Sequence, residues 1–409
     1  MYLHEIAIKN FSIHRDSRLA LHPITVFVGP NGSGKSAFFD ALLNFSMLAR
    51  GNIGQAFGPY PYSFAATRWR GAPGIGRISF NVVLSESQES ADRLHYKVDY
   101  SQEAGSESRP RFQIHNEVLE SLPAGEILFD RDNPSASRLP AATAHLAGDT
   151  GIFSAVRKAV TAGSSGFPPI VAACAREISR FNKFRLNPQN LAAPSDLPDL
   201  TRADPPRVSY EGGNLAAALD FLHETSDPSL QEIVAELRSV SGFENFEGFE
   251  FNTWGAQRVG FSARFADARQ SVPAPRLSDG QRLLIGLMVL VHSSARPPIL
   301  LLEEPENGLT APAQRVFYRA VRHLACHPDV AERSQVLISS HSPFVLCEAW
   351  NGEDRDFVHQ VRVQDGCAVV RSFADAVTAA GAMLRKTPEG RVELGLKNAE
   401  ELMSGYLAG

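Results

Sequence analysis

A single stretch decides how this chain folds: Gly29-Pro30-Asn31-Gly32-Ser33-Gly34-Lys35-Ser36. The five residues before it, 24–28, are apolar or β-branched, as in a buried parallel strand, and residues 37–48 have helical spacing. A strand, a glycine-rich loop and a helix in this order form a phosphate-binding loop. The sequence therefore predicts an α/β fold and a bound nucleoside triphosphate.

Each residue type in this stretch suits a phosphate ligand. The glycines let the backbone curl so that its N–H groups point at phosphate oxygens, at the positive end of the following helix. Lys35 is expected to reach the β and γ phosphates, and the Ser36 hydroxyl to ligate Mg²⁺. The predicted nucleotide-binding residues here are Gly29, Pro30, Asn31, Gly32, Ser33, Gly34, Lys35, Ser36 and Ala37.

Composition places the chain among ordinary globular proteins. It has 409 residues, of which 44% are hydrophobic and 21% charged. The net charge of −5 does not indicate binding to nucleic acid or to a membrane, but it is compatible with a local basic patch. The four cysteines form no Cys-x-x-Cys pair, which argues against a disulfide framework and a structural zinc site. No signal peptide and no apolar run of about 18 residues is present, so a cytoplasmic setting without a membrane is expected.

The first part of the chain reads as strands around the phosphate loop. Alternating or buried patterns predict strands at 3–11 and 18–28, then antiparallel strands of a small β-subdomain at 77–84, 94–100 and 111–118. We expect one domain over residues 1–409, with a lobe at 1–120, an insertion at 121–270 and a lobe at 271–409.

The insertion has mainly helical spacing and is expected to form a lid. Its predicted helices cover residues 151–162, 169–180, 214–222 and 229–240, and strand-like alternation returns at 246–265.

A second candidate phosphate contact lies at Leu277-Ser278-Asp279-Gly280-Gln281. The next residues, 282–292, are so apolar that they predict a buried helix, and the start of a helix presents free N–H groups and partial positive charge. Taken alone, Ser278 is more often a helix cap. Its place in the chain favours a nucleotide contact by Ser278, Gly280 and Gln281.

Two carboxylates and a histidine follow two further apolar strands. Glu303 and Glu304 directly follow the apolar residues 298–302. Two adjacent carboxylates at the end of a strand destabilise the fold unless a positive group binds there. Glu303 is assigned to the Mg²⁺ shell, through water, and Glu304 to the general base that polarises the attacking water. Solvated loop carboxylates are the alternative. His341 follows the strand 335–340 and is assigned as a γ-phosphate sensor, although a lone histidine is usually structural.

Together these motifs resemble the ABC-type ATPase heads of the SMC, RecF and OLD-like group. The resemblance rests on Gly29–Ser36 as Walker A, Leu277–Gln281 as the ABC signature, Leu300–Glu304 as Walker B and His341 as the switch histidine. It implies a P-loop NTPase with an ABC-ATPase-like mixed sheet, an antiparallel β-subdomain and an inserted helical lid. Only 68 residues follow His341 (409 minus 341), too few for the Toprim nuclease domain of OLD-like proteins.

The resemblance also implies a cofactor, a partner and catalytic residues. It implies that ATP and Mg²⁺ bind between two head-to-tail copies, where Ser278 and Gly280 of one copy close over the γ-phosphate held by Lys35 of the other. Lys35, Glu304 and His341 would be catalytic. Asp279 and Glu303 depart from the transporter pattern, and Gln55 and Gln189 are both open as the Q-loop glutamine.

The sequence leaves three functions to weigh. The first is an ATPase that dimerises around ATP and gates a separate effector, in anti-phage defence or DNA maintenance. The second is a RecF-like clamp on DNA. It is supported by Arg68 with Arg70 and by a cluster of basic and aromatic residues, since such residues together can bind nucleic acid. The plainer interpretation of that cluster is a lid helix that runs into a strand. The third is a transporter subunit. The cluster contains Arg176, Arg180, Phe181, Lys183, Phe184 and Arg185.

One further spacing could indicate a metal site. His323 and His327 stand four residues apart beside Cys326, and exposed helix residues are the other reading.

Overall fold

The computed structural model describes residues 1–58, 62–71, 76–103, 111–140, 143, 146–202, 205–254, 257–379, 385–386 and 392–404. The chain divides into two compact units. The first unit contains Met1–Phe181 and His359–Ala376, and the second contains Asn182–Val358 and Val377–Gly409. Within the described residues, no helix is both long and apolar enough to cross a membrane.

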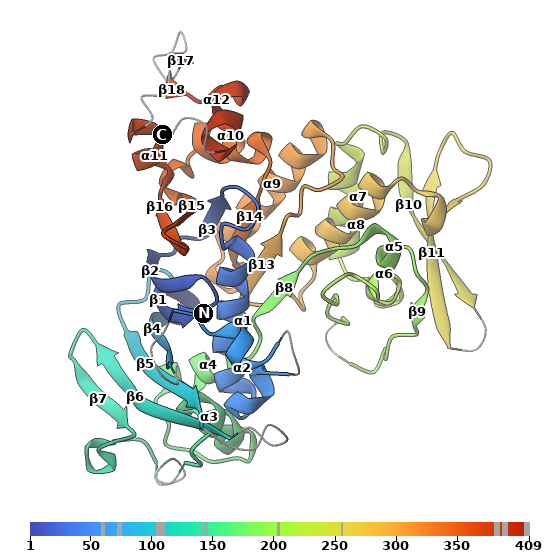
Figure 1. Cartoon of the computed structure of the whole chain (residues 1–409). Helices are drawn as coiled ribbons and strands as arrows, with labels where there is room; N and C mark the ends of the chain where they lie inside the picture. The colour runs from blue at the N-terminus through green and yellow to red at the C-terminus, as the bar shows by residue number, and fades with distance from the viewer. Residues whose placement is uncertain are drawn as a thin grey trace. The chain divides into compact units, whose positions relative to one another are not determined.

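The first unit contains a six-stranded antiparallel sheet in the order β2-β1-β4-β5-β6-β7 (Figure 1). Ile8 of β1 lies opposite Ser17 of β2 on one side and Phe80 of β4 on the other, so the opening strands belong to the same sheet as the predicted β-subdomain. Alternate residues of β4 and β5 are buried, as expected of strands with one face on a core. The strands are β1 (Tyr2–Phe11), β2 (His14–Ala20), β4 (Ile78–Ser85), β5 (Arg93–Gln102), β6 (Phe112–Leu122) and β7 (Glu126–Asp130).

The phosphate loop of the first unit joins β3 (Ile24–Val28), in which every residue is buried, to α1 (Lys35–Arg50). Strand β15 pairs with β3 on one side and with β16 on the other. Helix α1 packs against α3 and α4, and its Phe45 ring lies 5.6 Å from the Phe80 ring, between centroids. The remaining elements of this part are α2 (Phe64–Thr67), α3 (Ile152–Thr161), α4 (Pro169–Ile178), β15 (Val358–Gln364) and β16 (Cys367–Ser372).

Three parallel strands organise the second unit in the order β14-β13-β8. They are β8 (Asn182–Phe184), β13 (Ile299–Glu303) and β14 (Gln335–Ser340). Leu301 of β13 lies opposite Lys183 of β8 and Leu337 of β14, so the carboxyl ends of all three strands meet at one edge. Polar residues that follow these strands are therefore brought together there.

Helices and a second antiparallel sheet complete the second unit. Helix α8 (Asp279–His292) packs against α7 and α9, and β10 with β11 forms the long hairpin drawn in yellow in Figure 1. The other elements are α5 (Pro188–Leu191), β9 (Ser195–Asp196), α6 (Leu215–Glu224), α7 (Ser229–Arg238), β10 (Phe246–Trp254), β11 (Arg258–Phe265), β12 (Val272–Pro273), α9 (Ala311–Ala325), α10 (Pro343–Asn351), β17 (Arg385–Lys386), β18 (Val392–Glu393) and α12 (Leu396–Ser404). Helix α11 (Phe373–Ala379) begins in the first unit and ends in the second.

The predicted fold class is confirmed: the chain contains both parallel strands and an antiparallel sheet. Residues 121–270, expected as a helical lid, contribute α3 and α4 to the first unit and α5 to α7 to the second. The division into lobes at 120 and 270 stays a prediction.

Candidate functional site

The phosphate loop has backbone geometry that only glycine tolerates at two positions. Gly29 has a φ of 153°, and a Cβ atom there would lie 2.1 Å from the Val361 carbonyl oxygen of β15. Gly34 has a φ of 112°, and a Cβ atom there would lie 2.9 Å from Ile13 and 3.0 Å from Ala368. The β1–β2 turn and the β15–β16 hairpin therefore hold the loop in shape.

Polar groups inside the loop are arranged for an anionic ligand. The Lys35 ammonium donates to the carbonyl oxygens of Gly29, at 2.8 Å, and Pro30, at 3.0 Å, so it lies along the inside of the loop. The buried hydroxyl of Ser33 has no hydrogen-bond partner among the described residues. Helix α1 begins right after Gly34 with no acidic residue in its first turn. Free N–H groups, a lysine and an unpartnered hydroxyl fit a phosphate group.

All nine predicted residues of the first motif lie in this loop or in the first turn of α1. Sequence reasoning missed a tenth residue that supports them. The His14 ring is fully buried, with Nε2 3.0 Å from the Gly34 carbonyl oxygen and Nδ1 2.8 Å from the Ser17 hydroxyl. Burial lowers the pKa of His14, although the bond to Gly34 opposes this effect. A neutral His14 that donates to Gly34 and accepts from Ser17 fixes the end of the loop.

The signature segment, Leu277–Gln281, forms the start of α8. Ser278 is the N-cap and accepts from the Gln281 backbone, while the Gln281 side chain accepts from the Ser278 backbone at 3.0 Å, which is a capping box. The Gln281 amide also donates to the Gly242 carbonyl oxygen. A Cβ atom on Gly280 would lie 2.8 Å from the Gly308 carbonyl oxygen. The side chains of Ser278 and Gln281 thus serve the helix cap, and their contact with a nucleotide stays a prediction.

Glu303 and Glu304, called the acid pair below, lie at the carboxyl end of β13. Glu303 is buried, with its Oε2 atom 3.3 Å from the Lys183 ammonium. Glu304 has a φ of 48°, a left-handed conformation that costs about 1–2 kcal/mol in a residue other than glycine. Its backbone N–H donates to the Ser339 carbonyl oxygen of β14 at 2.9 Å. Such local strain is typical of functional sites.

The Glu304 carboxylate is held from three sides. Its Oε1 atom lies 3.1 Å from Nε2 of His341, and its Oε2 atom lies 3.0 Å from the Arg185 guanidinium and 2.9 Å from the Asn307 amide. The structure therefore brings together Glu304 and His341, which the sequence singled out, and adds Arg185 and Asn307. The alternative of freely solvated loop carboxylates does not describe this arrangement.

A third carboxylate, Glu306, supports His341 and was also missed. Its Oε1 atom accepts from the Ser340 hydroxyl at 2.7 Å and from the His341 backbone at 2.8 Å. Burial raises the pKa of Glu306, although these two hydrogen bonds oppose the rise. Glu306 thus fixes the backbone at the point where His341 leaves β14. The sequence Glu-Glu-Pro-Glu placed this residue near the site but gave it no role.

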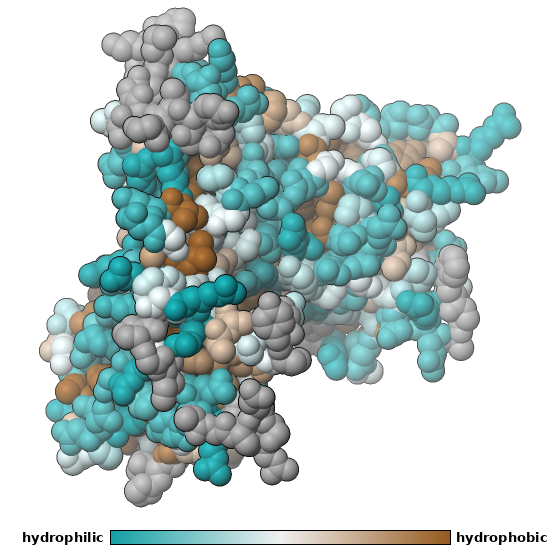
Figure 2. Space-filling view, in the orientation of Figure 1, coloured by the Kyte–Doolittle hydropathy of each residue, from teal (hydrophilic) through white to brown (hydrophobic). Residues whose placement is uncertain are grey.

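The basic and aromatic cluster has an internal role. Phe181 and Phe184 are buried, and four ion pairs engage the basic residues: Arg176 and Arg180 with Glu177, Lys183 with Glu303, and Arg185 with Glu304. The aromatic rings are therefore not available for stacking on bases. On the face drawn in Figure 2, hydrophilic side chains prevail and hydrophobic ones show in small groups.

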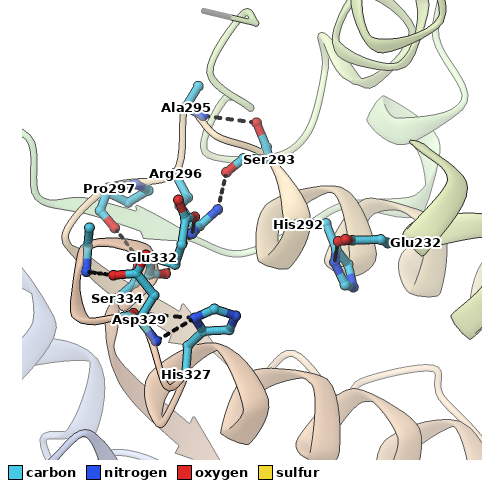
Figure 3. A network of polar contacts seen from close by, with 11 residues as sticks. Glu232, His292, Ser293, Ala295, Arg296, Pro297, His327, Asp329, Glu332 and Ser334 are labelled. Atoms are coloured by element: carbon cyan, nitrogen blue, oxygen red, sulfur yellow. Dashed lines mark hydrogen bonds and ion pairs between the residues drawn. The ribbon is translucent and has the colours of Figure 1, made fainter. Parts of the chain in front are cut away.

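A separate polar network lies at the far end of α8 (Figure 3). His292 lies between two glutamates of α7, with Nδ1 3.1 Å from Glu232 and Nε2 3.3 Å from Glu236. Nearby, Arg296 pairs with Glu332 at 2.7 Å. These side chains line a cavity of about 690 Å³.

The two candidate metal-binding histidines border the same cavity. The His323 and His327 rings lie 5.3 Å apart, His323 is exposed, and Nδ1 of His327 accepts from the Asp329 backbone. No group of three or more His, Cys, Asp or Glu among the described residues could hold a metal ion. All four cysteines are free thiols.

The succession of β3, the glycine-rich loop and α1 defines a P-loop protein. The family model described as "AAA domain, putative AbiEii toxin, Type IV TA system" matches residues 24–347. Since this match covers well over half of the 409 residues, the chain belongs to that family, and the predicted kinship with P-loop ATPase domains is confirmed. No curated protein matches the chain.

Three solved structures of SMC heads are similar to the chain. One is the SMC head domain from Thermotoga maritima, with 17% identity and a TM-score of 0.45 over 91% of this chain and 99% of that one. A second is an Smc head bound to the C-terminal winged-helix domain of ScpA, with 12% identity and a TM-score of 0.47 over 92% and 100%. A third, derived from Pyrococcus furiosus, is an Smc head with an extended coiled coil bound to the C-terminal domain of ScpA, with 11% identity and a TM-score of 0.44 over 92% and 98%.

Proposed function

We propose that this chain is a cytoplasmic ATPase that binds Mg·ATP, dimerises around it, hydrolyses it to ADP and phosphate, and gates a partner effector. The observation that carries the proposal is the contact between Glu304 and His341, which follow two adjacent parallel strands. The Oε1 atom of Glu304 lies 3.1 Å from the Nε2 atom of His341. At such an edge of the sheet, the carboxylate is suited to orient a water molecule and the neighbouring imidazole is suited to contact a phosphate.

Each motif has a defined task in this reaction. Lys35 would bind the β and γ phosphates, and the backbone N–H groups of the phosphate loop would surround them. Ser36 and Glu303 would hold Mg²⁺, Glu303 through water, and Mg²⁺ when bound neutralises charge on the phosphate oxygens. Glu304 would accept a hydrogen bond from the attacking water, and His341 would contact the γ-phosphate.

The fit of these residues to their ligands rests on the described contacts. The unpartnered hydroxyl of Ser33 and the start of α1, which has no side-chain cap, support a phosphate in the loop. Hard cations prefer carboxylate and hydroxyl oxygens, and Mg²⁺ in nucleotide sites usually takes only one or two protein ligands besides phosphate and water. A group of several protein ligands is therefore not required.

Dimerisation would complete the site from a second copy. Ser278 and Gly280 stand at the start of α8, where helix N–H groups and the positive end of the helix favour an anion. In a two-fold dimer these groups would face the γ-phosphate held by Lys35 of the other copy. ATP would hold the copies together, and hydrolysis would release them.

The biological role that we propose is control of an effector in anti-phage defence or DNA maintenance. The description of the family names a putative toxin of a type IV toxin–antitoxin system, which supports the defence role. A RecF-like DNA clamp has less support, because the aromatic residues of its main candidate cluster are buried and its basic residues are ion-paired.

Release of inorganic phosphate from Mg·ATP by the purified chain tests the enzymatic part of this proposal. We expect slow turnover that needs Mg²⁺ and is lost in Glu304→Gln. Turnover that survives this substitution at the native rate would contradict the assignment of the base.

A further inference from the structure

Two basic residues of the second unit reach the acid pair from the neighbouring strand. Lys183 lies in β8, and Arg185 comes two residues after Lys183, directly after the end of the strand, so both point to the same side of it. Because β8 runs parallel to β13, with Phe184 opposite Leu302, the two cations lie level with the end of β13. Lys183 contacts Glu303 at 3.3 Å, and Arg185 contacts Glu304 at 3.0 Å.

These contacts balance the charge of the acid pair without a metal. The side chains of Glu303 and Lys183 are only 4% and 11% exposed, and a carboxylate buried to that degree needs a positive partner. Tyr210 encloses the pair, since its hydroxyl lies 3.5 Å from Glu303 and its ring centroid 5.5 Å from the Lys183 ammonium. Arg185, with its side chain 55% exposed, covers Glu304 from the solvent side.

We propose that Lys183 and Arg185 are resident counter-ions that compete with Mg²⁺ for the acid pair. They neutralise Glu303 and Glu304 while no Mg·nucleotide is bound, and Mg²⁺ with its shell of water must displace the Lys183 ammonium from the Glu303 carboxylate. The metal would then bind only when nucleotide phosphates supply further ligands, so an empty site would not collect Mg²⁺. This inference rests on the proposed function, because that proposal assigns Glu303 to Mg²⁺.

Competition of this kind can be measured without turnover. The thermal unfolding midpoint of the native chain is followed against MgCl₂ concentration, with saturating ADP and with no nucleotide, and compared with that of Lys183→Met. Without Mg²⁺ the variant should unfold at a lower temperature, because Glu303 loses its partner. With ADP, half of the Mg²⁺ effect should be reached at about tenfold lower Mg²⁺ than in the native chain, which corresponds to about 1.4 kcal/mol of competition removed. An equal or higher Mg²⁺ requirement would overturn the inference.

A second variant keeps the test valid if Lys183→Met does not fold. Arg185→Gln alters an exposed side chain and should lower the Mg²⁺ requirement in the same direction by a smaller factor. Arg202→Gln, which removes an exposed ion pair with Asp199 in the same unit, is the matched control and should leave the Mg²⁺ requirement unchanged. A shift in the control equal to that of Arg185→Gln would contradict a specific role.

The two proposals fail in different ways. If ADP with Mg²⁺ does not raise the unfolding midpoint of the native chain, nucleotide binding itself is wrong, and the inference falls with it. If ADP with Mg²⁺ does raise that midpoint but the variants at Lys183 and Arg185 need as much Mg²⁺ as the native chain, only the counter-ion role is wrong.

Discussion

The Nε2 atom of His341 lies 3.1 Å from the Oε1 atom of Glu304. The contact arises because β13 and β14 are adjacent parallel strands, with Glu303 opposite Ser339, so that the residues after each strand meet. The backbone bond from Glu304 to Ser339 and the left-handed φ of Glu304 fix the direction of the carboxylate. The two side chains therefore face each other at one edge of the parallel strands.

Replacing Glu304 with glutamine should separate binding from chemistry. The amide keeps the size of the side chain but cannot take a proton, so phosphate release should fall by about 10²–10⁴-fold while nucleotide affinity stays close to native. Phosphate release and ADP binding, measured on the same preparation, check this. Glu348→Gln, which changes a carboxylate paired with Arg315 in the same unit, serves as the control and should hydrolyse ATP at the native rate.

The parts of the site that the sequence predicts are those defined by local pattern. Gly29–Ser36 is recognisable because its loop geometry depends on neighbouring residues, and the strands 298–302 and 335–340 because their apolar runs are continuous. The contacts of His14 with Gly34 and of Arg185 with Glu304 were not predicted, because they depend on which strands and turns meet in space. No spacing rule in a single sequence encodes such pairing.

The basic and aromatic cluster illustrates the same limit. In the sequence it indicated either a nucleic-acid surface or, as the plainer reading, a lid helix that runs into a strand. The pairing of β8 with β13 places its lysine and its last arginine on the acid pair, and both of its phenylalanines are buried. The same residues thus have a different meaning once their neighbours are known.

Replacing Lys35 with alanine should remove nucleotide binding. The ammonium is the one charged donor inside the described phosphate loop, and a hydrogen bond to a charged group contributes about 1.5–3 kcal/mol, so the loss of two such bonds to phosphates weakens binding by about 10²-fold or more. Calorimetric titration with ATP measures this. Lys9→Ala, at an exposed lysine paired with Asp16, should bind ATP with native affinity.

A methyl group on Gly29 should damage the loop. Its Cβ atom would lie 2.1 Å from the Val361 carbonyl oxygen, so Gly29→Ala must move either the loop or β15, at a cost of about 1–3 kcal/mol in unfolding free energy. ATP affinity should fall in parallel, because the N–H groups lose their alignment. Urea unfolding and ATP titration check both effects. Gly395→Ala, where a Cβ atom meets nothing within 4 Å, should change neither.

Stability should depend on pH through His292. Burial lowers the pKa of His292, but the ion pairs with Glu236 and Glu232 outweigh it and raise the pKa above its usual 6.5. The folded state therefore favours the protonated ring, and the resulting stabilisation is complete below pH 6.5 and is lost as the pH rises through the raised pKa.

Urea unfolding from about pH 6 to about pH 9 tests this dependence. The native chain should lose stability with rising pH more steeply than His292→Gln, whose side chain does not titrate. Asp227, Arg296, His323, His327 and Glu332 border the same cavity and are common to both proteins, so their contribution cancels in the comparison. Identical pH profiles would rule out the ion pairs of His292 as a source of stability.

The solution mass of Glu304→Gln, measured with and without Mg·ATP, is the decisive test of an ATP-bridged dimer. The substitution should leave ATP bound and unhydrolysed, so the mass should rise from that of one 44.5 kDa chain to that of two when Mg·ATP is added. Adding Lys35→Ala to the same chain should abolish the rise. A single-chain mass in the presence of demonstrably bound ATP would contradict an ATPase that works as an ATP-bridged dimer.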